Sequence, residues 1–291
     1  MGDWTIRRAM MRARGALLAA ALLCGCGPQL GDLEKGERGR VVDAYSGDTL
    51  VLDSGLRVFL AEIDAPRGDA PHARAAQQDL EALALHREAQ LAYGGTRRWN
   101  PSRSDGDDTV SETAIAHVFV KSEGGRWIWL QQALVLQGAA YVQPRADNHA
   151  RMGELYSTEA HARETEAGLW SERAYRTLSP ARAAEEATTL EAPCQDRSAP
   201  FRFVEGVVRA VRPSDRRIVF ELEAPQEAPF SLVAFGRTVS DWHGPAPSSL
   251  EGQRVLARGN LEYLSAREND RAGVAQMCIW DSGAIERLAA R

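Results

Sequence analysis

Two carboxylates at the ends of short strand-like runs suggest a specific chemistry. Asp48 lies in the turn sequence SGD at residues 46–48. Asp64 lies in the sequence IDAP at residues 63–66, at the end of a later strand-like run. A hard divalent cation prefers oxygen ligands, so a converging pair of acids would suit such an ion. The alternative is structural, with Asp48 as a turn residue beside a glycine and Asp64 as a strand terminator ahead of Pro66.

The stretch from residue 39 to residue 66 must position this pair. Its apolar and polar residues alternate through three short runs, which are broken at residues 46–48 and again at residues 53–55. Period-two alternation between breaks rich in Gly, Ser and Asp predicts a three-stranded antiparallel meander with tight turns. Both carboxylates would then lie at strand ends, where side chains leave the sheet and can converge.

Helices and further strands are predicted to follow the meander. Apolar residues at helical spacing predict an amphipathic helix over residues 71–89. The polar stretch at residues 96–111, with its Gly, Pro and Asp, predicts an exposed loop. Further strands are predicted at residues 90–93, 113–120 and 139–143, and further helices at residues 128–138 and 148–169.

A different pattern begins near residue 178. Residues 178–198 are rich in Ala, Glu, Thr and Pro and predict a linker that is helical in part. Five short strand-like runs separated by polar turns then predict a small OB-like β-barrel over residues 199–291. The runs lie at residues 201–211, 217–222, 230–235, 254–264 and 274–280. The predicted fold class is therefore mainly β with α, in two successive domains.

The N-terminus has the features of an export signal. Four arginines between residues 7 and 14 precede an apolar run at residues 16–23, which is too short for a permanent membrane span. The run ends in LCGC, which resembles the lipobox of bacterial lipoproteins, and the small residue Gly25 makes Cys26 the lipid acceptor. The resemblance implies a cleaved signal peptide at residues 1–25 and a tether at residues 26–38. An ordinary signal peptide with two incidental cysteines is the alternative.

Export would place Cys194 and Cys278 in an oxidising compartment. An even pair of cysteines there can form a disulfide, which would tie the linker to a late strand. Two free buried thiols are the alternative.

Composition sets limits on the class of protein. The 291 residues suit one or two domains, and 44% apolar with 26% charged residues is ordinary for a soluble globular protein. A net charge of -5 argues against a general polyanion binder, because no overall positive field attracts phosphates. The six histidines show no metal-ligand spacing.

Four segments in order resemble the staphylococcal-type thermonuclease (TNase-like, SNase-like) family. They are SGDTLVL at residues 46–52, the strand ending in IDAP at residues 63–66, ALVLQGAAYV at residues 133–142 and EAGLW at residues 166–170. The resemblance implies a five-stranded OB-fold β-barrel with three helices over residues 39–177, which agrees with the predicted meander and helices.

Active members of this family cleave phosphodiester bonds with one calcium ion. The resemblance implies that Asp48, Asp64 and the backbone carbonyl of Ala65 are the Ca²⁺ ligands. In the family, a glutamate just after the proline positions or activates the attacking water. Two arginines neutralise the phosphate as it gains charge in the transition state.

The sequence departs from the family at all three of the non-metal positions. Arg67 stands where the glutamate is expected, Phe59 stands at the first arginine position, and Thr113 occupies the place of the second. Loss of one preorganised charge-stabilising donor typically costs about 10²–10³ in rate. We therefore expect a domain that is inactive or strongly impaired.

Four side chains are the ones to examine as substitutes: Arg57, Arg67, Asp69 and Arg103. Arg57 shares a strand face with Phe59, since it lies two residues away. Arg103 could enter from the long polar loop. Asp69 could replace the base if the turn from Arg67 to Asp69 is reshaped.

The C-terminal part resembles a domain that often follows envelope TNase-like domains. The segments that carry this resemblance are FVEGVVRAV at residues 203–211, LEGQRVLARGNLEYL at residues 250–264 and IERL at residues 285–288. OB-folds commonly bind oligonucleotides or oligosaccharides. A structural or protein-contact role is equally open for this one.

Three hypotheses follow for the whole chain. The first is a lipid-anchored protein of the bacterial cell envelope, facing the periplasm, whose degenerate thermonuclease-like domain binds or scaffolds. The second is an active metal-dependent nuclease that uses relocated residues on extracytoplasmic nucleic acid. The third is a structural envelope lipoprotein. The expected partners are the membrane through the N-terminal lipid, nucleic acid or oligonucleotide, and other envelope proteins.

Overall fold

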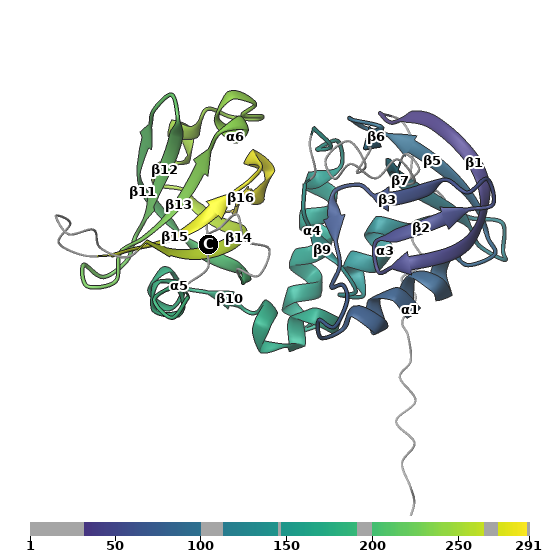
Figure 1. Cartoon of the computed structure of the whole chain (residues 1–291), viewed down its shortest axis with the longest axis horizontal. Coiled ribbons are helices and arrows are strands. Elements are labelled where there is room, and N and C mark those ends of the chain that lie inside the picture. The colour runs from purple at the N-terminus through teal and green to yellow at the C-terminus, as the bar shows by residue number, and fades with distance from the viewer. Residues whose placement is uncertain (1–31, 100–112, 145–146, 191–199, 265–272, 290–291) are drawn as a thin grey trace, which may run out of the picture.

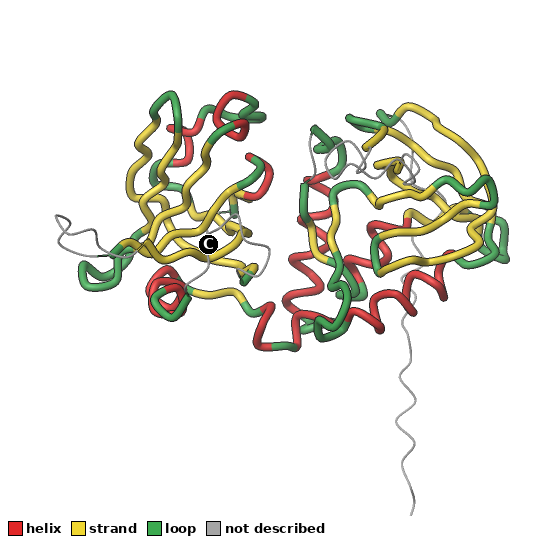
Figure 2. Tube along the Cα trace, in the orientation of Figure 1, coloured by secondary structure: helices red, strands yellow, loops and turns green. Residues whose placement is uncertain are grey.

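The computed structural model describes residues 32–99, 113–144, 147–190, 200–264 and 273–289. These residues form two β-rich lobes that lie side by side, the first on the right of Figure 1 and the second on the left. Helix and strand are distributed unequally, because the long helices lie in and beside the first lobe (Figure 2). No helix in the described ranges is long and apolar enough to cross a membrane.

The first lobe is a closed five-stranded barrel. Its strands are β1 (Glu34–Ser46), β2 (Thr49–Leu52), β3 (Arg57–Leu60), β5 (Glu88–Tyr93) and β7 (Thr113–Lys121). They pair in the order β3-β2-β1-β5-β7, and β7 closes the ring by pairing in parallel with β3. The predicted meander is therefore β1 to β3. Short strands β6 (Arg98–Trp99) and β8 (Trp127–Trp129) add to β7.

Three helices cover this barrel, as the family resemblance implied. They are α1 (Ala73–Ala84), α3 (Leu130–Leu136) and α4 (Met152–Glu164). α1 buries Ala76, Leu80 and Ala84, which recur every four residues and therefore share one helix face. All three helices are shorter than predicted, because part of each predicted range forms turns, short strands or the 3-10 helix η1 (Gly168–Ser171).

The second lobe is another five-stranded barrel. Its strands are β11 (Phe201–Pro213), β12 (Arg217–Leu222), β13 (Phe230–Phe235), β14 (Arg254–Leu264) and β15 (Val274–Ile279). β13 pairs in parallel with β15, and β11 pairs with β14 to close the ring. The strands thus connect as in the first barrel, where the third and fifth strands are also parallel neighbours. The predicted OB-like second barrel is confirmed.

Short elements complete the second lobe. α6 (Arg237–Ser240) and the 3-10 helix η3 (Pro247–Leu250) lie between β13 and β14. After β15 the chain forms η4 (Ser282–Ala284) and β16 (Ile285–Arg287), and β16 pairs with β14.

Two segments predicted as connectors are structured, which corrects those predictions. β1 begins at Glu34, inside the predicted tether, because its first residues pair with β5. In the predicted linker, β10 (Thr177–Leu178) pairs in parallel with β11, and α5 (Pro180–Ala187) follows. α5 buries alanines in the core of the second barrel, so this part of the chain belongs to that barrel. The remainder of the predicted linker, at residues 191–198, lies outside the described residues.

An aromatic cluster joins the two lobes. Tyr141 of the short strand β9 (Tyr141–Val142) stacks with Phe201 at a ring-centroid distance of 5.2 Å. Trp170 of η1 makes an edge contact with Phe203 at 4.9 Å. Leu256 of β14 completes the buried cluster. Because its members come from both lobes, burial of apolar surface holds the lobes together.

A buried charge network lies beside this cluster. Arg258 of β14 is 1% exposed and donates to the Val142 carbonyl of the first lobe at 2.8 Å. Its guanidinium also bonds to Glu159 of α4 at 2.9 Å and to Glu286 of β16 at 2.8 Å. Tyr156 of α4 packs its ring against the guanidinium, with 4.7 Å between the charged carbon and the ring centroid. One cation therefore bridges a carboxylate of each lobe in a site closed to water.

Two titratable groups lie across the same boundary. Burial raises the pKa of Glu286 to about 7, although Arg258 lowers it and Glu159 raises it further. His149 lies 2.7 Å from Asp281, and this hydrogen bond raises the pKa of His149 above its ordinary value against the effect of burial. The contacts between the lobes therefore include a carboxyl group with a pKa of about 7 and a histidine whose pKa is raised.

The cysteine predictions are tested only in part. Cys278 on β15 is fully buried and disulfide-bonded. Cys24, Cys26 and Cys194 lie outside the described residues, so the lipid acceptor and the pairing with Cys194 stay predictions.

Replacement of Arg258 by methionine should strongly destabilise the chain. The substitution removes the fully buried cation and, among the described residues, leaves Glu159 and Glu286 with Arg163 alone, which lies 3.1 Å from the first and 3.9 Å from the second. Breaking a buried pair in this way costs about 3–5 kcal/mol. Urea unfolding of the wild type and the variant measures this loss. Arg209→Met removes an arginine that pairs with Glu221 on the surface, and it should cost at most about 1 kcal/mol. Equal losses in the two variants would contradict the structural importance of the network.

The melting temperature should fall as pH rises from about 5 to about 7. Glu286 has a raised folded pKa, so the folded state binds more protons than the unfolded state and stability declines as pH rises to about 7. His149 acts with the same sign, since its raised pKa gives stability that is lost as pH rises through it. Thermal melts of the double variant Glu286→Gln, His149→Gln should show a flatter profile. His161→Gln, at an exposed position of α4, should retain the wild-type slope.

Candidate metal and nucleic-acid site

The two carboxylates predicted to converge do so. Asp48 lies in the turn between β1 and β2 and is only 1% exposed, and Asp64 ends β4 (Ile63–Asp64) with 20% of its side chain exposed. The backbone N–H of Ala65 donates to one oxygen of each, at 3.2 Å in both cases. The strand end thus brings the two acids to a single backbone amide.

Hydroxyl groups hold both carboxylates in place. Ser46 donates to Asp48 Oδ1 at 2.8 Å, and Thr49 donates to the same oxygen at 3.1 Å. Tyr141 donates to Asp64 Oδ2 at 3.3 Å. Sequence reasoning did not assign these three residues to the site. Ser46 and Thr49 could have been found from their positions beside Asp48, but Tyr141 could not, because β9 reaches Asp64 only through its pairing with β4.

The guanidinium of Arg67 lies between the two acids. Its Nη2 atom bonds to Asp48 Oδ2 and lies 2.9 Å from Asp64 Oδ1. Burial acts to lower the pKa of Arg67, but the charges of Asp64 and Asp48 outweigh it and raise the pKa above its ordinary value. Arg67 therefore remains a cation, and it supplies the positive charge that the pair of acids requires.

This arrangement does not fit a calcium ion. A Ca²⁺ ion needs six to eight oxygen ligands, whereas here the carboxylate oxygens that face each other bind a guanidinium. Within the described ranges, no group of three or more His, Cys, Asp or Glu residues could hold a metal ion. Binding of a cation to Asp48 and Asp64 would first require Arg67 to leave.

The proposed substitutes differ in their surroundings in the described structure. Arg57 lies on β3 and stacks on Tyr45, with 4.6 Å between its charged carbon and the ring centroid. Asp69 is exposed in the turn after Arg67. Phe59 lies beneath the Arg67 guanidinium at 5.9 Å, so it fills an arginine position with a ring. Arg103 lies outside the described residues. Of the three candidates that the structure describes, Arg67 is the one that bonds to both aspartates.

A polar groove of about 790 Å³ adjoins the acid pair. Tyr45 and Arg67 lie along one side, and α1 contributes Arg74 together with glutamine side chains to the other. Tyr45 is 63% exposed and carries Arg57 on its ring. An exposed aromatic ring beside arginines is the combination that stacks a base and neutralises a phosphate.

Sequence comparison with known proteins also relates this chain to nucleases. Residues 57–172 match the family described as Staphylococcal nuclease homologue. The chain is 30% identical over 164 residues to Protein ParB of Escherichia coli, a match that spans 56% of this chain and 85% of that protein. It is 29% identical over 167 residues to Micrococcal nuclease of Shigella flexneri, which spans 57% of this chain and 89% of that protein.

The region matched by the family, residues 57–172, contains β3, β5 and β7 of the first barrel, its three helices and Asp64, whereas β1, β2 and Asp48 precede it. The closed five-stranded ring, the convergence of Asp48 with Asp64 and these sequence matches agree. The chain belongs to the staphylococcal nuclease homologue family.

Proposed function

We propose that this protein is a lipid-anchored envelope protein whose nuclease-like domain binds nucleic acid without calcium-dependent cleavage. The observation that carries the proposal is the bond of Arg67 to both Asp48 and Asp64. An internal cation takes the place of the metal that the family uses, and it does so at the position where the family has a glutamate. The domain then keeps its scaffold and its groove while the metal-dependent step is lost.

Electrostatics supports this assignment of Arg67. A guanidinium binds carboxylates through a planar fork of donors and stays charged at every physiological pH. It is tethered three residues from Asp64, so its effective concentration at the pair does not depend on the calcium in solution. With 42% of its side chain exposed, Arg67 can still be displaced, and the ion pair is therefore open to experiment.

The proposed ligand is single-stranded nucleic acid in the groove lined by Tyr45 and Arg74, with Arg57 beside it on the Tyr45 ring. The relative named Micrococcal nuclease supports nucleic acid as the ligand class. Because the net charge of the chain is -5, phosphates are attracted only where arginines are close together and not by the protein as a whole. A short oligonucleotide therefore suits the groove better than a long duplex. The export signal and Cys26 support a place at the envelope, with the lipid as the membrane contact.

Calcium should not stabilise the wild type, but it should stabilise Arg67→Gln. Glutamine removes the internal cation and leaves two carboxylates to bind the ion. Ligand at ten times its Kd adds about 1.4 kcal/mol to the free energy of unfolding. Thermal melts of residues 27–291, which contain every described residue, with calcium or with a chelator measure this effect. Arg74→Gln, in the same groove, should behave like the wild type, and a calcium-dependent rise in the wild type would contradict the proposal.

The wild type should not cleave plasmid DNA or RNA in a calcium-dependent manner. The metal position is filled, and Phe59 and Thr113 supply none of the transition-state charge. A digestion assay on residues 27–291 with and without calcium tests this expectation. Calcium-dependent cleavage that Asp48→Ala abolishes would instead establish an active nuclease with relocated residues.

Binding of a short single-stranded oligonucleotide should weaken steeply as salt increases. Each phosphate contact that is lost makes the affinity less dependent on salt. Arg57→Gln should therefore reduce both the affinity and the slope of its logarithm against the logarithm of the salt concentration. Tyr45→Ala should weaken binding about tenfold, since base stacking contributes roughly 1–3 kcal/mol. Fluorescence anisotropy measures both effects, with Arg126→Gln as an exposed control in the same lobe. Absence of binding at low salt would favour a purely structural lipoprotein.

A further inference from the structure

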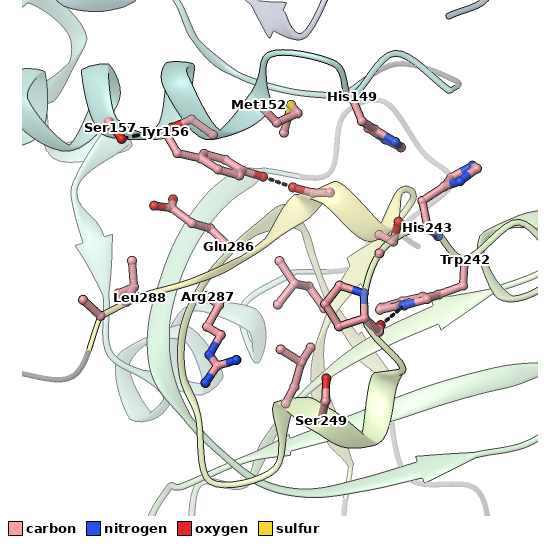
Figure 3. A pocket seen from close by; sticks show the side chains of 18 of the residues that line it. His149, Met152, Tyr156, Ser157, Trp242, His243, Ser249, Glu286, Arg287 and Leu288 are labelled. Carbon is pink, nitrogen blue, oxygen red and sulfur yellow. Dashed lines mark hydrogen bonds between the residues drawn. The ribbon is translucent and has the colours of Figure 1, made fainter.

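A pocket of about 610 Å³ lies between the two lobes, away from the acid pair. One wall is α4 with the residues just before it, and the other is formed by the loop after α6, by η3 and by β16. Figure 3 shows side chains of α4 facing those of the second barrel across this space. The volume lies in the range of small-molecule sites, about 300–1,000 Å³.

Rings line much of the pocket. Tyr156 comes from α4, and its hydroxyl donates to the Gly283 carbonyl of the other lobe. The Trp242 indole donates to the Pro245 carbonyl at 2.9 Å and stacks on Phe220 at 5.6 Å, so its orientation is fixed from two sides. Fixed aromatic side chains offer flat apolar surface with little loss of entropy on binding.

Two histidines from different lobes meet at one end of the pocket. The rings of His149 and His243 make an edge contact at 5.1 Å, and His149 is anchored by Asp281. Figure 3 shows the pair beside Trp242. The aromatic lining is therefore continuous across the lobe boundary.

The pocket also carries an uncompensated positive charge. Arg287 lines it and is exposed, and its side chain has no acidic partner among the residues that the structure describes. Glu286 also lines the pocket, but its carboxylate is already bound to Arg258 at 2.8 Å. The charge available to a ligand is thus a guanidinium, which recognises carboxylate, sulfonate or phosphate oxygens in a bidentate manner.

We propose that this pocket binds a small planar aromatic molecule that carries a negative charge. Trp242, Tyr156 and the histidine pair accept the ring, and Arg287 binds the anionic group. Because α4 supplies one wall and the second barrel supplies the other, the bound molecule contacts both lobes. The proposal is independent of the nucleic-acid groove, which lies on α1 and the β1–β2 turn of the first lobe.

Fluorescence titration of residues 27–291 with two probes tests the proposal. Anilinonaphthalene sulfonate is an aromatic anion, and N-phenylnaphthylamine is the same molecule without the sulfonate. The anionic probe should bind saturably and at least about tenfold more tightly than the neutral one, and Arg287→Gln should remove that difference. Trp242→Ala should weaken both probes.

Gly153 provides a variant that blocks the pocket without disturbing the fold. It lines the pocket on α4, and a Cβ placed there meets no atom within 4 Å. Gly153→Trp should therefore abolish binding of both probes and leave the melting temperature within a few degrees of the wild type.

The matched controls are Trp280→Ala, an exposed aromatic on the second barrel outside the pocket, and Arg126→Gln. Both should bind the probes as the wild type does. Probe binding that survives Gly153→Trp would overturn the pocket as the site. Equal affinity for the two probes in the wild type would overturn the anionic class of ligand.

Discussion

The burial of Arg258 is the constraint on which the arrangement of the two lobes depends. A fully buried guanidinium is tolerated only when acceptors surround it, because an isolated charge is very costly away from water. Its acceptors come from α4, from the end of β9 and from β16. Since they belong to both lobes, separation of the lobes would expose Glu159 and Arg258 together. The barrels are thereby fixed in one relative position, and the pocket between α4 and the second barrel is a consequence.

An arginine between two carboxylates occurs twice in the structure, and the two arginines differ in their exposure to water. Arg67 lies between Asp48 and Asp64 as Arg258 lies between Glu159 and Glu286. In each case one guanidinium binds two carboxylates that lie on separate segments of the chain. Arg258 is closed to water and fixes structure, whereas Arg67 is 42% exposed in its side chain at the edge of a groove. Exposure to water weakens an ion pair and allows its partners to be exchanged for ligands. The contacts of Arg258 are therefore structural, whereas those of Arg67 remain accessible to ligands.

The barrels could be predicted from the sequence because each strand run alternates with period two and ends at turn residues. The convergence of Asp48 with Asp64 followed from the family resemblance and from their place at strand ends. The ionic contact of Arg67 could not be predicted, since it depends on the turn that follows Pro66 and on a side-chain rotamer. The network around Arg258 was missed for a different reason. Its partners are 99 and 28 residues away, and an arginine within an apolar strand carries no local indication of them.

The position of Arg67 separates two properties that the family normally combines. In the proposed function, metal binding depends on the charge between Asp48 and Asp64, and we expect a substitution at residue 67 to change it. Cleavage depends in addition on cations that stabilise the transition state, and Phe59 and Thr113 provide none. Each missing donor costs about 10²–10³ in rate, and two such losses remain after the metal site is restored. A variant that regains calcium would therefore still lack two of the cations that stabilise the transition state in the family.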